Sequence, residues 1–186
     1  MRVLKSVCFI FIAVSCLYAK KWEFDYGYPF YSPISKQDNI KVTTERCQFE
    51  AGILFEPVPF LLAGPRLGWT AWNMTFEGQS DLKYSISKFA FSYVIRPRKQ
   101  ICKNTWLFFE ASGSLEHFDF SLGIPNGIYS PILSTSLDKN EWGAGHSLGV
   151  GIELFHITAS INHDAHLTES IGNELSGLRL QFGVWF

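Results

Sequence analysis

The chain has 186 residues and a formal net charge of −1, and aromatic residues make up 16% of it. This length fits a single domain, and the near-neutral charge gives no electrostatic reason to expect nucleic acid as a partner. No apolar run after the amino terminus reaches the roughly 18 residues of a membrane-spanning helix. A place in a membrane would therefore require a closed β-barrel, whose interfacial belts use many aromatic residues.

The first residues have the features of a secretory signal peptide. Positive charges precede the apolar stretch 7–14, and Ala19 is a suitable cleavage position. We therefore predict a signal peptide over residues 1–19 and a β-barrel domain over residues 20–186. A weak match to a lipoprotein cleavage box before Cys16 leaves lipidation as an alternative.

Eight segments of the chain have the character of β-strands. Most of them alternate apolar and polar residues, as strands do because successive side chains point to opposite faces, and one is rich in glycine. They cover residues 22–30, 46–57, 66–76, 84–95, 105–118, 142–152, 154–163 and 177–186. No stretch keeps a period of 3.6 residues, so we expect little helix.

The polar face of these segments carries many charges. Its charged members are Glu23, Asp25, Glu50, Glu56, Glu110, Glu116 and Arg179. So many charges would be costly in the dry core of a soluble sandwich, but they can pair in the polar interior of a barrel. We therefore predict an all-β fold, an eight-stranded antiparallel transmembrane β-barrel whose interior is filled by side chains and leaves no open pore.

The last segment, 177–186, indicates where this barrel belongs. Its apolar residues share one face, and the chain ends on the aromatic Phe186. The pattern resembles the closing strand of bacterial outer-membrane barrels, in which such residues form the signal for the barrel assembly machinery. The resemblance implies the bacterial outer membrane as the location and outer-membrane lipids as partners.

The connections between the segments fit a barrel with both chain ends in the periplasm. The outer loops would be 31–45, 77–83, 119–141 and 164–176, and the periplasmic turns would fall near 58–65, 96–104 and residue 153. The outer loops are on average the longer set, as expected for such barrels. The basic run 96–99 would then lie in a solvated periplasmic turn.

Two cysteines, Cys47 and Cys102, remain after removal of the signal peptide. A disulfide between them is open to an exported protein. The strand assignment places them near opposite ends of the barrel, which favours two unpaired thiols. Two cysteines also supply too few ligands for a metal site, and we predict no cofactor.

The densest polar cluster is the segment 162–166, with the sequence Asn-His-Asp-Ala-His. His163 shares the parity of Ile161 and should face lipid near the outer rim, whereas Asp164 should face inward. A histidine within hydrogen-bond reach of a carboxylate can act as a general base. The alternative, favoured by composition alone, is a polar rim whose histidines contact lipid headgroups.

Several segments resemble one enzyme family. Gly143-Ala144-Gly145, Leu148-Gly149-Val150, Ile161 to Leu167, Glu174-Leu175-Ser176 and the stretch 108–113 look like parts of the lipid A 3-O-deacylase (acyloxyacyl hydrolase-like) barrels. The resemblance covers roughly residues 105–186. It implies an esterase that removes an acyl chain from the lipid A of lipopolysaccharide, using a serine, a histidine and an acid.

The family motif transfers only in part to this chain. The resemblance implies Glu174 as the orienting acid and His163 as the base or its relic, but Ile161 stands at the family's histidine position and His163 at its serine position. Isoleucine can neither take nor give a proton. Two hypotheses therefore stand: a lipid A esterase, and a non-catalytic barrel with a structural, lipopolysaccharide-binding or adhesive role.

Overall fold

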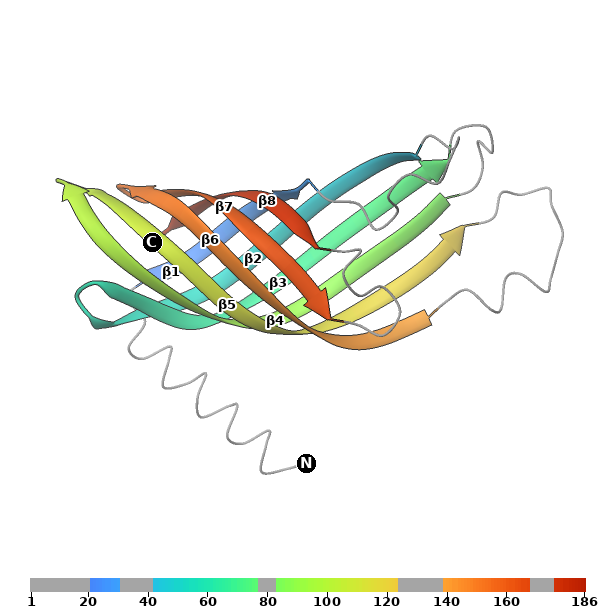
Figure 1. Cartoon of the computed structure of the whole chain (residues 1–186), viewed down its shortest axis with the longest axis horizontal. Coiled ribbons are helices and arrows are strands. Elements are labelled where there is room, and N and C mark those ends of the chain that lie inside the picture. The colour runs from blue at the N-terminus through green and yellow to red at the C-terminus, as the bar shows by residue number, and fades with distance from the viewer. Residues whose placement is uncertain (1–20, 31–41, 77–82, 124–138, 168–175) are drawn as a thin grey trace, which may run out of the picture.

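Eight strands form one closed antiparallel barrel (Figure 1). The computed structural model describes residues 21–30, 42–76, 83–123, 139–167 and 176–186. The strands are β1 (Lys21–Pro29), β2 (Val42–Val58), β3 (Leu61–Phe76), β4 (Lys83–Cys102), β5 (Thr105–Gly123), β6 (Lys139–Leu154), β7 (Ile157–Leu167) and β8 (Gly177–Trp185). The predicted eight-stranded antiparallel barrel is confirmed. Within the described ranges, no helix has the length and apolar character needed to cross a membrane.

The barrel closes where the first strand meets the last. On β1, Phe24 lies opposite Ala51 of β2 and opposite Val184 of β8. Two backbone hydrogen bonds extend this closure to the chain end: Trp22 N donates to Phe186 O at 3.1 Å, and Phe186 N donates to Trp22 O at 2.9 Å. Because β1 and β8 pair with each other, the sheet has no unpaired edge along this seam.

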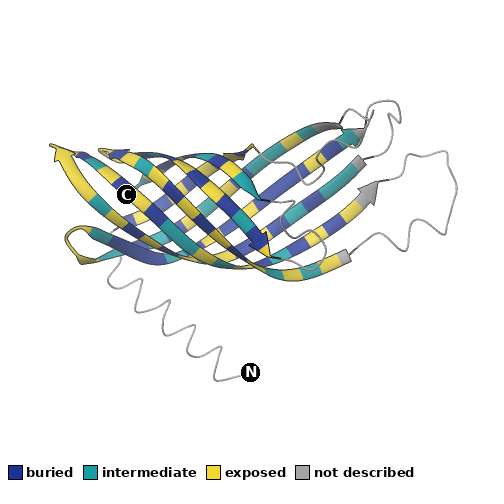
Figure 2. Cartoon of the chain, viewed as in Figure 1, coloured by how far each residue is buried: buried dark blue, intermediate teal, exposed yellow. Residues whose placement is uncertain are grey.

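Buried and exposed residues alternate along the strands of the barrel wall (Figure 2), and the two faces differ in polarity. On β1, Trp22, Phe24 and Tyr26 point outward and are 48%, 49% and 45% exposed, while Glu23 and Asp25 point inward and are buried. All eight strands carry large apolar side chains on the outside, with Phe49, Leu67, Phe91, Phe109, Val150, Ile161 and Phe182 as examples from β2 to β8. The predicted inward acidic residues are therefore on the predicted face.

The interior is polar at its centre and apolar in two places. Trp72, Met74, Ile86, Phe118 and Phe120 form a buried cluster on the parts of β3, β4 and β5 that lie farthest from the chain ends. A smaller cluster of Leu54, Leu62 and Val94 lies toward the other mouth. Both clusters fill the lumen beside the charged side chains described below.

At the mouth that holds Lys21 and Phe186, the turns at 59–60 and 103–104 are tighter than predicted, and the third turn lies at 155–156 and not at residue 153, which belongs to β6. Strand β4 continues to Cys102 and β5 begins at Thr105, so residues 96–99 belong to a strand and not to a turn. The prediction that Arg96 is solvated is wrong, because its side chain points inward and is 2% exposed. Pro97, in the same run, lies within the strand opposite Leu61.

The turn between β4 and β5 contacts the turn between β6 and β7. Asn104 and Phe155 both have positive φ angles, 62° and 54°, a conformation that Asn tolerates and that is unusual for a bulky residue. Phe155 N donates to Asn104 O at 3.0 Å, and this hydrogen bond links the β6–β7 turn to the β4–β5 turn.

The remaining predictions on the chain's course have mixed outcomes. Cys47 and Cys102 are both free thiols, as predicted. Strands β2, β5, β6 and β7 extend into the predicted outer loops, ending or beginning at Val42, Gly123, Lys139 and Leu167. The predicted signal peptide, Cys16 and Glu174 lie outside the described residues.

One inward glycine permits the close approach of β2 and β3. A methyl group on Gly64 would lie 2.0 Å from Ile53 O and 3.2 Å from Leu54 Cα. These are backbone atoms of the paired strand, which cannot move aside without disturbing the sheet. We expect Gly64→Ala to lower the free energy of unfolding by about 1–3 kcal/mol, measured by urea titration of the barrel in detergent micelles.

Gly113→Ala is the matched control for this substitution. Gly113 has no atom within 4 Å of the added methyl group, and both changes restrict the unfolded chain alike. The difference between the two unfolding midpoints therefore reports the clash in the folded barrel. Equal midpoints for the two variants would show that β2 and β3 do not pack as closely as described.

Candidate functional site

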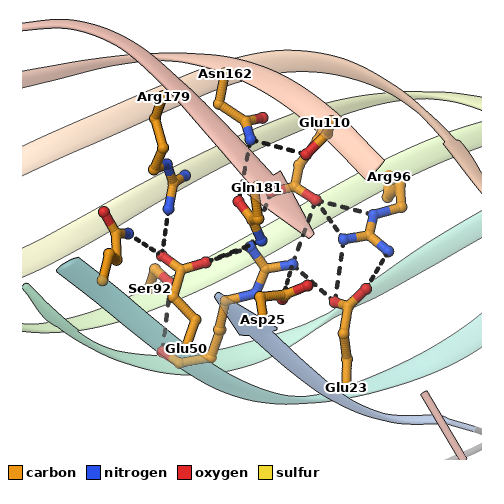
Figure 3. A network of polar contacts seen from close by, with 12 residues as sticks. Glu23, Asp25, Glu50, Ser92, Arg96, Glu110, Asn162, Arg179 and Gln181 are labelled. Carbon is orange, nitrogen blue, oxygen red and sulfur yellow. Dashed lines mark hydrogen bonds and ion pairs between the residues drawn. The ribbon is translucent and has the colours of Figure 1, made fainter. Parts of the chain in front are cut away.

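Arg96 on β4 organises the central part of the barrel interior (Figure 3). Its guanidinium donates to Glu23 of β1 through Nη1–Oε1 at 2.6 Å and Nη2–Oε2 at 3.0 Å. It also donates to Glu110 of β5 through Nε–Oε2 at 2.9 Å. All three side chains are nearly inaccessible to solvent. Charge-assisted contacts to a planar guanidinium fix its orientation as well as its charge.

Arg66 on β3 extends these contacts to a third carboxylate. It donates to Glu23 at 2.8 Å and to Glu110 at 2.9 Å, and its Nη1 lies 3.0 Å from Oε2 of Glu50 on β2. Two guanidinium groups are thus held between three carboxylates from three different strands. We call these five residues, Glu23, Glu50, Arg66, Arg96 and Glu110, the central ion-pair network.

Strands β7 and β8 connect to this network through Glu50 (Figure 3). Arg179 Nη1 donates to Glu50 Oε1 at 2.8 Å, and Arg179 Nε lies 3.1 Å from Oδ2 of Asp164. Gln48 donates to the same glutamate at 2.7 Å. On β6, the inward residue Gly149 has no side chain and so leaves room for Asn162 of β7. A methyl group on Gly149 would lie 1.7 Å from Asn162 Oδ1.

A second polar group lies nearer the other mouth of the barrel, away from Lys21 and Phe186. Glu116 of β5 accepts from Lys88 Nζ at 3.2 Å and from Ser114 Oγ at 2.9 Å, and His166 Nδ1 lies 2.7 Å from its other oxygen. Beside this group is a cavity of about 30 Å³, with room for roughly one or two water molecules. The side chains around Glu116 are therefore closely packed.

The arrangement around Glu116 is not that of a serine hydrolase. In such a triad the serine hydroxyl donates to the histidine and the histidine to the acid. Here the Ser114 hydroxyl donates to the carboxylate of Glu116, and the histidine contacts the other oxygen of the same carboxylate. Glu116 thus separates the hydroxyl from the base, so this group serves packing and charge balance.

The predicted rim histidine, His163, lies on the outward face of β7 and is exposed. It is directly opposite Leu148 of β6 and Leu178 of β8. Ile161 and Ala165 flank it on the same face of β7. None of these four neighbours carries a hydroxyl or a carboxylate. Its predicted acid, Glu174, lies outside the described residues.

Asp164 and His166 lie on the inward face of the same segment. Their alternation with the outward residues is enough to indicate this position. Asp164 points inward as predicted and contacts Arg179. His166 has the same parity and is 2% exposed, with its ring edge-on to Phe118 at a centroid distance of 6.0 Å. The sequence showed His166 in the polar cluster, but its partner Glu116 is fifty residues away in the chain and was not predicted.

A further outward histidine, His117, lies on β5 beside Asp119. His117 Nδ1 is 3.7 Å from Asp119 Oδ1, and its ring lies 4.7 Å from that of Trp142 on β6. Strand β6 separates this pair from His163, so the two do not form one site. Within the described ranges, no group of three or more His, Cys, Asp or Glu side chains is placed to hold a metal ion.

Comparison with solved structures shows what the fold is similar to. No family model matches the sequence, and no curated protein matches it. The crystal structure of Ail, the attachment invasion locus protein of Yersinia pestis, is similar with a TM-score of 0.49 and 10% sequence identity. The similarity covers 89% of this chain and 98% of that chain. This chain is a closed eight-stranded antiparallel β-barrel, and its own strand pairing establishes that.

Proposed function

We propose that this chain spans the bacterial outer membrane as a closed, non-conducting barrel. The support is the apolar outer face, which carries large exposed hydrophobic side chains on all eight strands. A water-soluble monomer rarely exposes an apolar patch of more than a few hundred Å². Lipid removes this penalty, and a closed barrel satisfies its backbone groups without water.

The connections support one orientation in the membrane. The first and last described residues, Lys21 and Phe186, and the tight turns at 59–60, 103–104 and 155–156 lie at one mouth. The connections at the other mouth are longer in sequence. Since outer-membrane barrels keep short turns on the periplasmic side, the mouth at Lys21 faces the periplasm and the end near His166 faces the cell surface.

The role that the geometry supports best is non-catalytic: a structural barrel that contacts lipopolysaccharide around its outer rim. The ion pairs that cross the lumen carry this proposal, because they occupy the central part of the barrel through which a solute would have to pass. In planar lipid bilayers, we expect the purified barrel to show no stepwise conductance, and on gels a change of mobility on heating. Discrete channel openings in a heat-modifiable preparation would overturn the non-conducting role.

A second candidate is hydrolysis of an ester-linked acyl chain of lipid A. It is supported by the outward position of His163 near the proposed cell-surface end, and it is opposed by the leucines on both sides of that histidine. We expect lipid A from cells with and without the protein to have the same mass. Loss of one acyl chain, abolished by His163→Ala, would replace the non-catalytic role with the esterase.

A further inference from the structure

The periplasmic mouth holds a hollow of about 370 Å³, within the size range of small-molecule sites. Its aromatic lining comes from three separate places in the chain: Trp106 at the start of β5, Phe155 and His156 in the turn before β7, and Trp185 at the end of β8. Trp106 and Trp185 have the inward parity of their strands, whereas Phe155 and His156 are exposed in the turn at the rim.

The charges at this mouth are already balanced. Lys21 Nζ donates to Glu153 Oε1 at 2.6 Å, and Arg98 donates to the same oxygen at 3.3 Å. Arg98 also donates to Glu56 at 2.9 Å. Two cations thus face two carboxylates. A strongly charged ligand would have to break these pairs, so the hollow favours a neutral polar molecule.

Three lining residues have a buried polar atom that finds no hydrogen-bond partner among the described residues. They are the N–H donors Arg98 Nε and Trp185 Nε1 and the acceptor Glu153 Oε2. The side chains of Arg98 and Glu153 are only 6% and 2% exposed. Buried polar groups normally have partners. A hydroxyl group both donates and accepts, so a molecule rich in hydroxyls complements all three atoms.

The aromatic rings at the mouth are held in place by the same cations. Lys21 Nζ lies 3.5 Å from the ring centroid of Trp185, and the Arg98 guanidinium carbon lies 4.3 Å from that of Trp106. Such cation–π contacts orient the rings before any ligand arrives. Because Arg98 covers one face of Trp106, the opposite face of that ring is the flat apolar wall available to the C–H face of a sugar, whose edges carry the hydroxyls.

We propose that the periplasmic mouth binds a neutral saccharide unit of a cell-envelope glycan. The aromatic walls take the apolar faces of a sugar ring, and Arg98, Glu153 and Trp185 take its hydroxyls. The location of the ligand in the periplasm rests on the orientation proposed above, whereas the binding itself depends only on the folded barrel.

The test is titration of the purified barrel in detergent micelles with the trimer of N-acetylglucosamine, followed by isothermal calorimetry. We expect saturable binding with a dissociation constant of about 1 mM or tighter. Trp106→Ala should weaken it by about tenfold or more, and Trp106→Phe should restore most of it because an aromatic wall returns. Trp142→Ala, which removes an exposed tryptophan on the outer half of β6, should leave it unchanged.

Each outcome decides between the two proposals. Absence of binding to a heat-modifiable barrel would overturn the saccharide site and leave the membrane role intact. Equal weakening by Trp106→Ala and Trp142→Ala would also overturn it, because binding would then lie elsewhere. A chain that shows no heat-modifiable mobility would instead contradict the proposed membrane barrel.

Discussion

Arg96→Met is expected to lower the free energy of unfolding of the barrel by about 3–5 kcal/mol, the usual cost of removing one partner from a buried ion pair. Methionine fills much of the volume of arginine but leaves Glu23 and Glu110 without the guanidinium that lies between them. Both carboxylates are 1% exposed, so water cannot replace it. Urea titration of the barrel refolded into lipid vesicles measures the change.

Two further variants isolate the ion pairs from general effects of the substitution. Lys99→Met removes a positive charge from an exposed position on the same strand and should change stability by less than about 1 kcal/mol. In Arg96→Met, Glu23 and Glu110 keep only Arg66 as their cationic partner. Adding Glu110→Gln removes the excess negative charge of one of these carboxylates, so the double variant should be less destabilised than the sum of the single ones. A fully stable Arg96→Met barrel would show that the central ion-pair network contributes nothing to stability.

Val150→Arg is expected to destabilise the barrel in lipid vesicles by about 2–4 kcal/mol, the cost of placing a cation at the centre of a bilayer. Val150 points outward from β6 and is 61% exposed. It lies opposite Phe109 of β5 and Ile161 of β7, which are also exposed and apolar. This position is therefore in the middle of the apolar band that we place in lipid.

The matched control lies on the same face of the same strand. Trp142 is 66% exposed and lies opposite His117, where polar outward residues begin. Trp142→Arg should cost only about 0–1 kcal/mol, as found near membrane interfaces. On a barrel surrounded by water, both arginines would be solvated and both changes would be small. A near-zero effect of Val150→Arg in vesicles would thus contradict the membrane assignment.

The fold was predictable because side chains along a strand alternate between two faces, and this period of two residues is visible in the sequence. In β1 and β8, each residue's parity assigned its side chain to the correct face, and the burial of Glu23 and Gln181 follows that pattern. The strand ends were less predictable. The basic run 96–99 was predicted as a periplasmic turn, but it continues as β4 to Cys102.

For the candidate site residues, the sequence predicted the face of the strand on which each side chain lies but not its contacts. Parity placed His163 outward and Asp164 inward, and both are so. The contact between His166 and Glu116, and the enclosure of Arg96 by Glu23 and Glu110, join residues that are far apart in the chain. No local pattern indicates which inward side chains will meet, because this depends on the stagger of strands around the closed barrel.

The amino-acid sequence by itself determined that this chain forms eight strands with an apolar outer face and a charged inner one, because alternation is a property of each strand taken alone. Only the tertiary structure decided which charges neutralise one another. It brought Arg66 and Arg96 between three carboxylates, and it gathered Trp106 and Trp185 at one mouth. Those contacts exist because β1 closes on β8, which sets the register of every inward side chain against strands distant in the sequence.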